Sequence, residues 1–525
     1  MSEIIGIDLG TTNSGVAVWR DGKPQMIADA DGYHLTPSVV ALDPDNGQWM
    51  VGRQALRLQE HNPRAAIYSI KRLIGRRHEE LDVASLHVHI LYEIERARGQ
   101  RGVAVRVGDK ALTPQQVSAL ILRKLKADAE AYLGHPVSQA VITVPAYFHE
   151  SQRQATRDAG RIAGLEVKRV LNEPTAACLA FAYERLHQER HNVAVFDLGG
   201  GTFDISILGV GRGPFRVFAT NGDTQLGGDD LDLLVVKWIV GQCAAAEQER
   251  LSERIEAMAR LRRAAEMAKM ALSTEETTTI RLPDLLSGGE DLELVLTRQQ
   301  LDGLASKFIE DALLPCKKAL RDALESDVTL EEISEVLLVG GQTRMPAIRE
   351  AVGKLFGREP NVSVNPEEVV ALGAAVQAAI LMQKEGVKRI KLADVVPLSL
   401  GVRTKGGAMD TLIPRNTAVP VEKSKLYSTA EDNQDGIQVR VYQGEWRQVE
   451  DNVFLGEFKL QGIEPAPAGE PEIEVTFVVD VDGILHVSGK DLRTGNQQEL
   501  TITDSVRLSD EEIAAMVREV EAYSA

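Results

Sequence analysis

One pattern occurs twice in this chain: an apolar strand that ends in an acid, followed at once by a glycine turn and a hydroxyl residue. The first copy reads Ile5-Gly-Ile-Asp-Leu-Gly-Thr-Thr-Asn-Ser14, and the second reads Val195-Phe-Asp-Leu-Gly-Gly-Gly-Thr-Phe-Asp204. A turn without Cβ atoms lets backbone N–H groups approach a polyphosphate, and an acid at the strand end can hold the water shell of a magnesium ion. The two copies therefore predict two halves that clamp one triphosphate.

Composition and charge narrow the class of protein. The chain has 525 residues, 44% of them hydrophobic and 26% charged, as is ordinary for a globular protein of several domains. Its formal net charge of −18 argues against a general nucleic-acid or anionic-membrane surface, because such surfaces need a basic footprint. The three cysteines, Cys178, Cys243 and Cys316, have no spacing that suggests a zinc site or a disulfide framework. Without a signal-peptide pattern or a membrane-spanning run, we expect a cytoplasmic protein.

The first three quarters of the chain have the pattern of a layered α/β fold. Strands alternate with amphipathic helices up to about residue 385. The best-marked helix starts after Thr113, which forms a capping box with Gln116, and closes at Gly134. A buried strand over 140–144 follows, and a third strand with a glycine turn spans 336–346. Three related turns predict duplicated halves around a central crevice.

After a charged stretch at 384–391, short strands separated by turn residues predict a second, all-β domain. Its clearest hairpin has an alternating strand at 473–479, a turn at Asp482-Gly483 and a return strand through 485–487. The last helix begins with Ser509 capped against Glu512, and it carries an apolar stripe from Ile513 to Val520. We expect this stripe to pack back on the β domain or on another molecule.

Four segments in this order resemble DnaK-type chaperones of the 70-kDa heat-shock family. In chain order they are the first repeated motif, Asn172-Glu-Pro-Thr-Ala-Ala177, the second repeated motif, and Ser428-Thr-Ala-Glu-Asp-Asn-Gln434. The resemblance covers essentially the whole chain and implies an ATP-dependent molecular chaperone that binds extended apolar peptide segments. It implies an actin-like ATPase domain (1–387), an interdomain linker (388–394), a β-sandwich substrate-binding domain (395–507) and the first helix of a truncated lid (508–525).

The resemblance also implies ligands and partners. The ligands are ATP or ADP with Mg²⁺, and the partners are unfolded or extended polypeptide clients, a J-domain co-chaperone and a nucleotide exchange factor. The loop at 282–290 is shorter than the loop that contacts the exchange factor in a bacterial relative of this family. The identity of the exchange factor therefore stays open. Because only the first lid helix is present in the sequence, we expect bound peptide to leave quickly.

The catalytic residues follow from the resemblance and from the chemistry of the side chains. Asp8 and Asp197 suit magnesium, held through its waters, although strand-end acids also serve as turn formers or caps. Lys71 matches the lysine that the family directs at the γ-phosphate, and Glu173 matches the carboxylate near the attacking water. Asp204 is expected to orient the same water or to cap its strand. The implied catalytic set is Lys71, Glu173, Asp197, Thr202 and Asp204.

The nucleotide is expected to touch glycine turns and one helix. Glu266, Lys269 and Ser273 share a helical face, which also suits a solvent-exposed ion pair. Arg344 is expected to stack on adenine from one side only, because Met270 stands where some relatives have a second arginine. The implied nucleotide-binding residues are Gly10, Thr11, Thr12, Asn13, Gly199, Gly200, Gly201, Thr202, Gly227, Gly228, Glu266, Lys269, Ser273, Gly340, Gly341, Arg344 and Glu367.

Peptide binding and coupling are assigned by resemblance alone, since apolar residues on alternating strand positions are usually core. The implied peptide-binding residues are Val402, Lys405, Tyr427, Ala430, Ile437, Val439 and Ile473. The implied coupling residues are Pro145, Arg153, Ile390, Leu392 and Asp394. Lys391 and Ala393 make the linker less apolar than the family's leucine run, which predicts weaker docking. In the family, two residues form an arch over the bound peptide, and Lys405 and Ala430 match its two sides. The charge of Lys405 predicts a preference for peptides with acidic residues beside the apolar segment.

Other functional classes use the same ATPase plan. A sugar kinase or a filament-forming protein is disfavoured by the β domain after the linker. A holdase that binds nucleotide without useful turnover stays open as an alternative.

Overall fold

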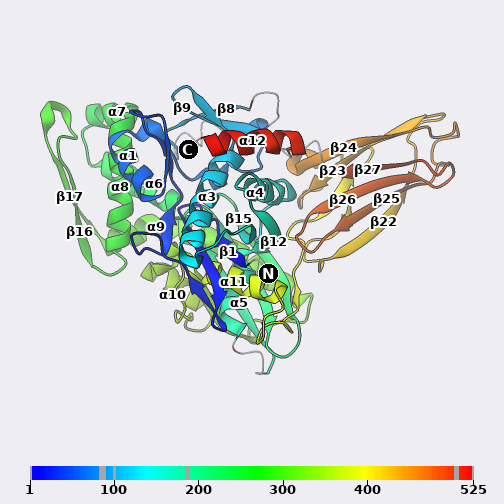
Figure 1. The fold of residues 1–525 in the computed structure, drawn as a ribbon, viewed down its shortest axis with the longest axis horizontal. Coiled ribbons are helices and arrows are strands. Elements are labelled where there is room, and N and C mark those ends of the chain that lie inside the picture. Colours follow the sequence, from blue (N-terminus) through cyan, green and yellow to red (C-terminus); the bar gives the residue numbers. More distant parts are fainter. Residues whose placement is uncertain (1–2, 82–89, 98–101, 184–188, 502–507, 523–525) are drawn as a thin grey trace.

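The structure is a computed structural model, and it describes residues 3–81, 90–97, 102–183, 189–501 and 508–522. Figure 1 shows a broad α/β part and, extending from one side of it, an elongated part made of strands. No helix within the described ranges is long and apolar enough to cross a bilayer.

Two sheets with the same strand pattern form the centre of the α/β part. In the first, β1 (Ile4–Asp8) pairs in parallel with β11 (Gln139–Val144) and antiparallel with β2 (Asn13–Arg20). In the second, β13 (His191–Leu198) pairs in parallel with β18 (Ile333–Val339) and antiparallel with β14 (Phe203–Val210). The repeated pairing supports the expected duplication. It also brings Asp8 and Asp197 to equivalent strand ends.

Further strands complete both sheets and their surroundings. The first sheet adds β3 (Lys23–Met26), β4 (Leu35–Pro37) and β12 (Glu166–Asn172), and the second adds β15 (Phe215–Asp223) and β19 (Leu392–Ala393). Small sheets are formed by β5 (Val40–Leu42), β6 (Trp49–Val51) and β7 (Ala66–Ile67), by β8 (Glu93–Arg96), β9 (Val103–Val107) and β10 (Lys110–Leu112), and by β16 (Thr277–Leu282) with β17 (Leu292–Thr297).

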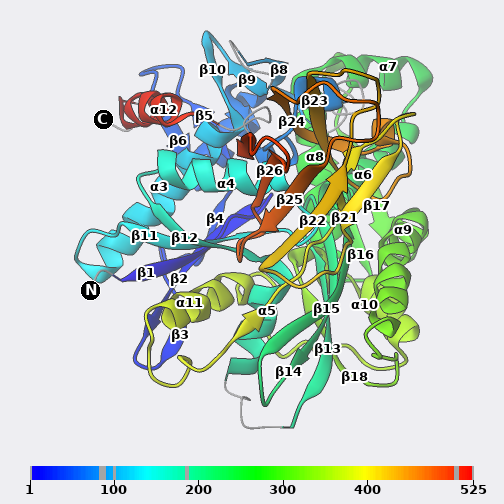
Figure 2. The ribbon, with the colours of Figure 1, turned by 90° about the vertical axis from the view of Figure 1, so that its right-hand side faces the viewer.

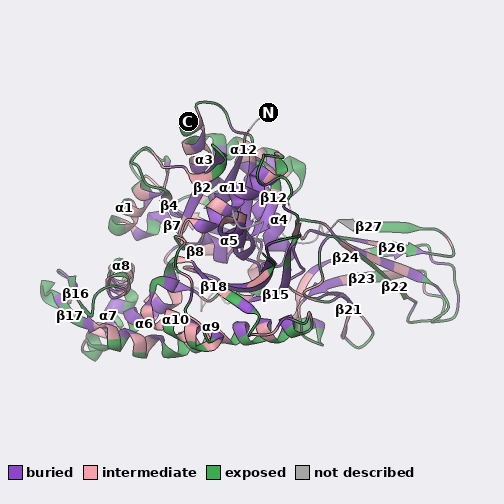
Figure 3. Ribbon diagram, turned by 90° about the horizontal axis from the view of Figure 1, so that it is seen from below, coloured by how far each residue is buried: buried purple, intermediate pink, exposed green. Residues whose placement is uncertain are grey.

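Helices cover the sheets and join them. Helices α5 (Glu173–Ala182) and α11 (Val369–Leu381) pack on each other between the two sheets, so that one apolar core includes strands of both. We call the first sheet with its helices the first lobe and the second sheet with its helices the second lobe. The other helices are α1 (Arg53–His61), α3 (Pro114–Leu133), α4 (Glu150–Ile162), α6 (Gly228–Gly241), α7 (Ala245–Glu253), α8 (Ile255–Ala271), α9 (Arg298–Leu324) and α10 (Pro346–Phe356). Figure 3 shows the buried residues concentrated in these central layers.

The local sequence signals hold in the structure. Thr113 caps α3 by accepting a hydrogen bond from the Gln116 N–H, and Gly134 ends the helix in the left-handed conformation. The predicted strand over 140–144 lies within β11, and helix α10 opens at Pro346. The capping box and the buried-strand pattern therefore predicted these elements correctly.

The elongated part consists of two four-stranded antiparallel sheets. One contains β20 (Leu400–Arg403), β21 (Met409–Ile413), β23 (Gly436–Gln443) and β24 (Val453–Gln461). The other contains β22 (Val421–Tyr427), β25 (Ile473–Val479), β26 (Leu485–Asp491) and β27 (Gln497–Thr501). The predicted hairpin is present, with Ile473, Val475, Phe477 and Val479 of β25 buried and the residues between them half-buried.

The last helix, α12 (Asp510–Ala522), packs where the sequence did not predict. Its apolar residues Ile513 and Val520 join the core of the first lobe, and Figures 1 and 2 both show it beside α3 and α4. Gln116 of α3 donates a 2.7 Å hydrogen bond to Glu519, and Arg161 pairs with Asp510. The expectation that the stripe packs on the β domain or on another molecule was wrong. An apolar stripe shows that a helix has a partner surface but does not identify it.

Candidate active site

A cleft of about 1400 Å³ lies between the two lobes. Both repeated glycine turns line it, together with the third turn after β18. The predicted site residues that line the cleft are Asp8, Gly10, Thr11, Thr12, Asn13, Lys71, Glu173, Asp197, Gly199, Gly200, Thr202, Gly228, Glu266, Lys269, Ser273, Gly340, Gly341, Arg344 and Glu367. Gly201, Gly227 and Asp204 are not among the lining residues.

The glycine turns pack so closely that a side chain would not fit. A Cβ atom on Gly200 would lie 1.9 Å from Thr12 Oγ1, and one on Gly10 would lie 2.0 Å from the Asn13 carbonyl oxygen. Thr12 Oγ1 is buried and has no hydrogen-bond partner among the described residues. Backbone N–H groups and one unpaired hydroxyl at a turn without side chains suit phosphate oxygens.

Four carboxylates gather at or beside the cleft: Glu173, Asp197 and Asp204 are buried, and Asp8 is half-buried. Burial and the charge of Glu173 raise the pKa of Asp8 to about 7. The same two causes raise the pKa of Asp204 to about 7, and burial, Glu173 and the other acids raise that of Asp197 well above its usual range. Carboxylates that oppose each other's ionisation leave a place where a bound cation would be stabilised.

One cation of the chain faces these acids. Lys71 Nζ lies 2.5 Å from Glu173 Oε1, and both side chains are buried. Lys71 belongs to the short 3₁₀ helix η2 (Ile70–Arg72) of the first lobe, whereas Glu173 is the first residue of α5. The pair therefore places one positive and one negative group beside the phosphate turns.

Asp8 and Asp197 supply carboxylate oxygens, which are donors that suit hydrated magnesium. The described residues contain no group of three or more His, Cys, Asp or Glu side chains arranged to hold a metal ion. Two carboxylates, Asp8 and Asp197, would hold hydrated Mg²⁺ without forming such a group. Asp8 is oriented by Thr143, whose hydroxyl donates a 3.1 Å hydrogen bond to Asp8 Oδ1.

The opposite end of the cleft contains the residues expected at the base and the ribose. Glu266 and Lys269 lie on α8, and Ser273 follows just after the helix end. Lys269 Nζ lies 2.8 Å from Asp232 Oδ1 and donates to the Gly228 carbonyl. Arg344 is held by Glu367 at 3.0 Å, and Met270 is exposed. Stacking of Arg344 on adenine stays a prediction.

Sequence reasoning missed several polar residues of the cleft region. Asp229 and Asp232 lie in the first turns of α6 and line the cleft, and burial raises the pKa of Asp232 to about 7. Arg72 is buried next to Lys71 and pairs with Asp230. Thr143 could have been found as the polar residue inside the apolar strand 140–144. The start of α6 could have been found from the acids that follow Gly227 and Gly228.

The residues expected to bind peptide are spread over the β part. Val402, Val439 and Ile473 are buried in its core, and Tyr427 is paired in register with Ile473. Ile437 packs against Ile473. Lys405 and Ala430 are exposed in loops. The assignment of these residues to a peptide channel remains a prediction.

Of the residues expected to couple the two parts, Arg153 and Asp394 lie together where the α/β part meets the β part, and the others lie elsewhere. Arg153 is buried and donates to Asn172 Oδ1 at 2.7 Å, one residue before Glu173. Burial lowers the pKa of Arg153, and the charge of Asp394 opposes this shift. Pro145 lies at the end of β11, and its carbonyl oxygen accepts from the Phe148 N–H. Ile390 is buried in the core that both lobes share.

Strand β19, which lies in the predicted linker, is paired with the second lobe. Leu392 lies opposite Phe215 in a parallel pair, and the Phe215 N–H donates to the Lys391 carbonyl. Asp394 Oδ2 accepts a 3.3 Å hydrogen bond from Thr175 of α5. The less apolar linker residues are therefore compatible with docking through the backbone.

Comparison with known families gives one finding. A family model described as Hsp70 protein matches residues 4–525, which is nearly the entire chain. The match includes the cleft, the linker and the β part.

Proposed function

Because the chain belongs to the Hsp70 family, whose members are ATP-dependent chaperones, we propose that it binds extended apolar peptides and switches their affinity by hydrolysing ATP. Hydrolysis would take place in the cleft between the lobes. The β part would hold the peptide, and strand β19 would connect the two. A J-domain protein and an exchange factor would act on this cycle.

In the proposed reaction, the residues of the chain position the phosphates and the attacking water. Lys71 would stabilise charge on the γ-phosphate, and Glu173 would orient the water or accept its proton. Thr12 and Thr202 would donate hydrogen bonds to phosphate oxygens, and Asp204 would orient the same water. Bound Mg²⁺, held through water by Asp8 and Asp197, would supply positive charge to the phosphates.

The observation that carries the proposal is the short path from Glu173 to the linker. Thr175 lies two residues after Glu173 on the same helix, and its hydroxyl donates to Asp394. Arg153, bonded to Asn172, approaches the same acid. A shift of α5 on hydrolysis would therefore reach the linker directly, which is what coupling of two sites requires.

For the peptide, we propose binding as an extended strand with a pocket for leucine-like side chains formed by the predicted residues of the β part. Lys405 would favour peptides with acidic residues beside the apolar centre. A leucine peptide flanked by Asp and Glu should bind more tightly than its twin flanked by Lys and Arg.

The test is ATP hydrolysis with and without an unfolded apolar peptide. We expect the peptide to accelerate steady-state hydrolysis several-fold. Leu392→Asp, which places a charge in the paired linker strand, should keep basal hydrolysis and lose the acceleration. Nucleotide binding without hydrolysis in the wild-type protein would instead identify a holdase.

A further inference from the structure

A short segment of the first lobe crosses the cleft and bonds to the second lobe at both of its ends. Ser69 Oγ donates a 2.7 Å hydrogen bond to Asp229 Oδ2, and Arg72 Nη2 donates to Asp230 Oδ2 at 2.6 Å. Ser69 and Arg72 flank Lys71 in the chain, whereas Asp229 and Asp230 lie in the first turn of α6. We call these four residues the cross-cleft clamp.

We propose that Ser69 and Asp229 are positioning residues that hold Lys71 in place for hydrolysis and delay opening of the cleft. The inference rests on the proposed ATPase function and deepens it, because it assigns a role to residues outside the motifs. The other half of the clamp, Arg72 with Asp230, secures the far end of the same segment.

The backbone of Ser69 supports this role. Its φ of 50° and ψ of 27° lie in the left-handed region, which is unfavourable for residues other than glycine. Such a conformation persists where surrounding contacts determine it. The Ser69 hydroxyl bonds to Asp229, and the residue is buried. A bond across the cleft thus fixes the turn from which η2 starts.

The clamp also touches the phosphate turn of the second lobe. The Asp229 N–H donates to the Gly200 carbonyl at 2.8 Å, and a Cβ on Gly200 would lie 3.4 Å from Asp229 Oδ1. A Cβ on Gly201 would lie 3.0 Å from Arg72 Nε. The clamp therefore ties Lys71 of one lobe to the glycine turn of the other.

The geometry explains how this would act on the reaction. Lys71 Nζ reaches Glu173 at 2.5 Å only while η2 stays in its present position. If the lobes separate, the Ser69–Asp229 bond breaks and η2 is free to move away from α5. Closure of the cleft and correct placement of Lys71 would then be one event.

The test uses the full chain and three substitutions. Ser69→Ala removes the hydroxyl, Ser69→Gly also relieves the left-handed strain, and Asp229→Ala removes the acceptor. Each should lower single-turnover ATP hydrolysis roughly tenfold and speed release of a fluorescent ADP, as expected for loss of a hydrogen bond to a charged group. The control Ser252→Ala, at an exposed serine that bonds only within its own helix, should change neither rate.

A double variant and a nucleotide-free measurement separate positioning from a structural effect. Ser69→Ala combined with Asp229→Ala should be no slower than Asp229→Ala alone. Asp229→Ala already removes the bond that Ser69→Ala removes, together with the 3.8 Å ion pair between Asp229 and Arg72. Hydrogen exchange of the amides at 70–73 should be faster in each variant without nucleotide. Wild-type behaviour of Ser69→Gly, multiplied effects in the double variant, or unchanged exchange would each overturn the proposal. A wild-type protein that does not hydrolyse ATP would refute the proposed function, and hydrogen exchange would still decide whether the clamp exists.

Discussion

At the scale of single residues, the buried pair of Lys71 and Glu173 makes the sharpest prediction. Lys71→Met keeps a long side chain but removes the charge that lies near Glu173 and the Phe148 ring, and Glu173→Gln keeps the shape of the carboxylate. Either change should lower single-turnover hydrolysis by about 100-fold or more, because positioned charge supplies most of the catalysis. Nucleotide affinity, measured by calorimetry, should change only slightly. Hydrolysis within a few-fold of wild type would contradict the assigned roles.

A second residue-scale prediction concerns acid stability. His149 is buried among Arg76, Arg77 and Arg153, and burial followed by these charges lowers its pKa to about 3. The folded state therefore binds fewer protons than the unfolded state between pH 3 and 6.5, so stability is present above pH 6.5 and is lost as the pH falls. Protonation of this histidine in the unfolded state should lower the free energy of unfolding by about 2 kcal/mol at pH 5 relative to pH 7.

His149→Asn tests this pH dependence, since asparagine is neutral and suits the start of α4. Urea unfolding at pH 7 and pH 5 should show a smaller loss of stability in the variant than in the wild type. Equal losses in both proteins would show that His149 does not titrate on unfolding.

Individual residues also show what sequence can and cannot predict. The acids and glycines of the cleft follow from a local pattern, because a strand end and its turn are neighbours in the chain. Ser69 and Asp229 bond across 160 positions, and neither belongs to a recognisable motif. Their contact depends on how two lobes close, which no local periodicity encodes. Thr143 lies between these two cases in predictability. Its polar side chain within an apolar strand is visible in the sequence, but its contact with Asp8 is not.

At the scale of elements, α12 shows the same limit and allows a matched test. Its capping pair and apolar stripe were predicted, but its place on α3 and α4 depends on contacts between distant segments. Val520→Asp places a charge in the buried face, and Ala514→Asp places the same charge on the exposed face. Because an unpaired buried charge is costly, only Val520→Asp should release the helix.

Hydrogen exchange measures the release of α12. In Val520→Asp, the amides of α12 should lose protection while those of the central strands β1 and β11 keep theirs. Ala514→Asp should exchange like the wild type. Continued protection of α12 in Val520→Asp would mean that other contacts hold the helix, such as Gln116 with Glu519.

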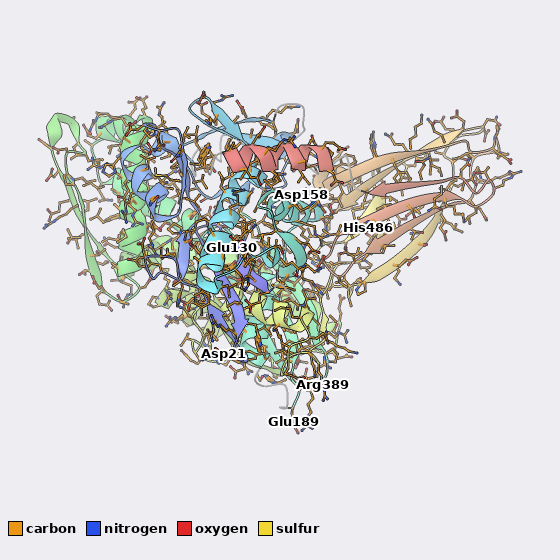
Figure 4. The ribbon with its side chains drawn as sticks, in the orientation of Figure 1. Asp21, Glu130, Asp158, Glu189, Arg389 and His486 are labelled. Atoms are coloured by element: carbon orange, nitrogen blue, oxygen red, sulfur yellow. The ribbon has the colours of Figure 1, made fainter. Side chains whose placement is uncertain are left out.

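At the scale of the whole molecule, the β part is held to the α/β part by separate polar contacts. Asp482, in the turn before β26, pairs with Arg157 of α4 and Arg169 of β12. Figure 4 labels Asp158, the residue after Arg157, and His486, four residues past Asp482, on the two sides of this contact. A second contact joins Asp322 of α9 to Arg415 and Asn416. The arrangement therefore depends on charged groups of moderate burial and on the linker, which favours reversible docking.

Removing both contacts should release the β part from the α/β part. In Asp482→Asn combined with Asp322→Asn, Arg157, Arg169 and Arg415 lose their ion pairs across the interface, and Arg415 keeps only its pair with Glu445 of the β part. The apolar cores of both parts stay intact. We expect a larger radius of gyration by small-angle scattering and an unchanged unfolding midpoint of the α/β part. Glu350→Gln, which breaks an exposed ion pair with Lys354 far from this interface, is the control and should leave the radius unchanged. An unchanged radius in the double variant would mean that contacts other than the ion pairs hold the two parts together, such as strand β19 and the bonds from the Glu150 N–H to Gln443 and from the Thr220 N–H to Asn416.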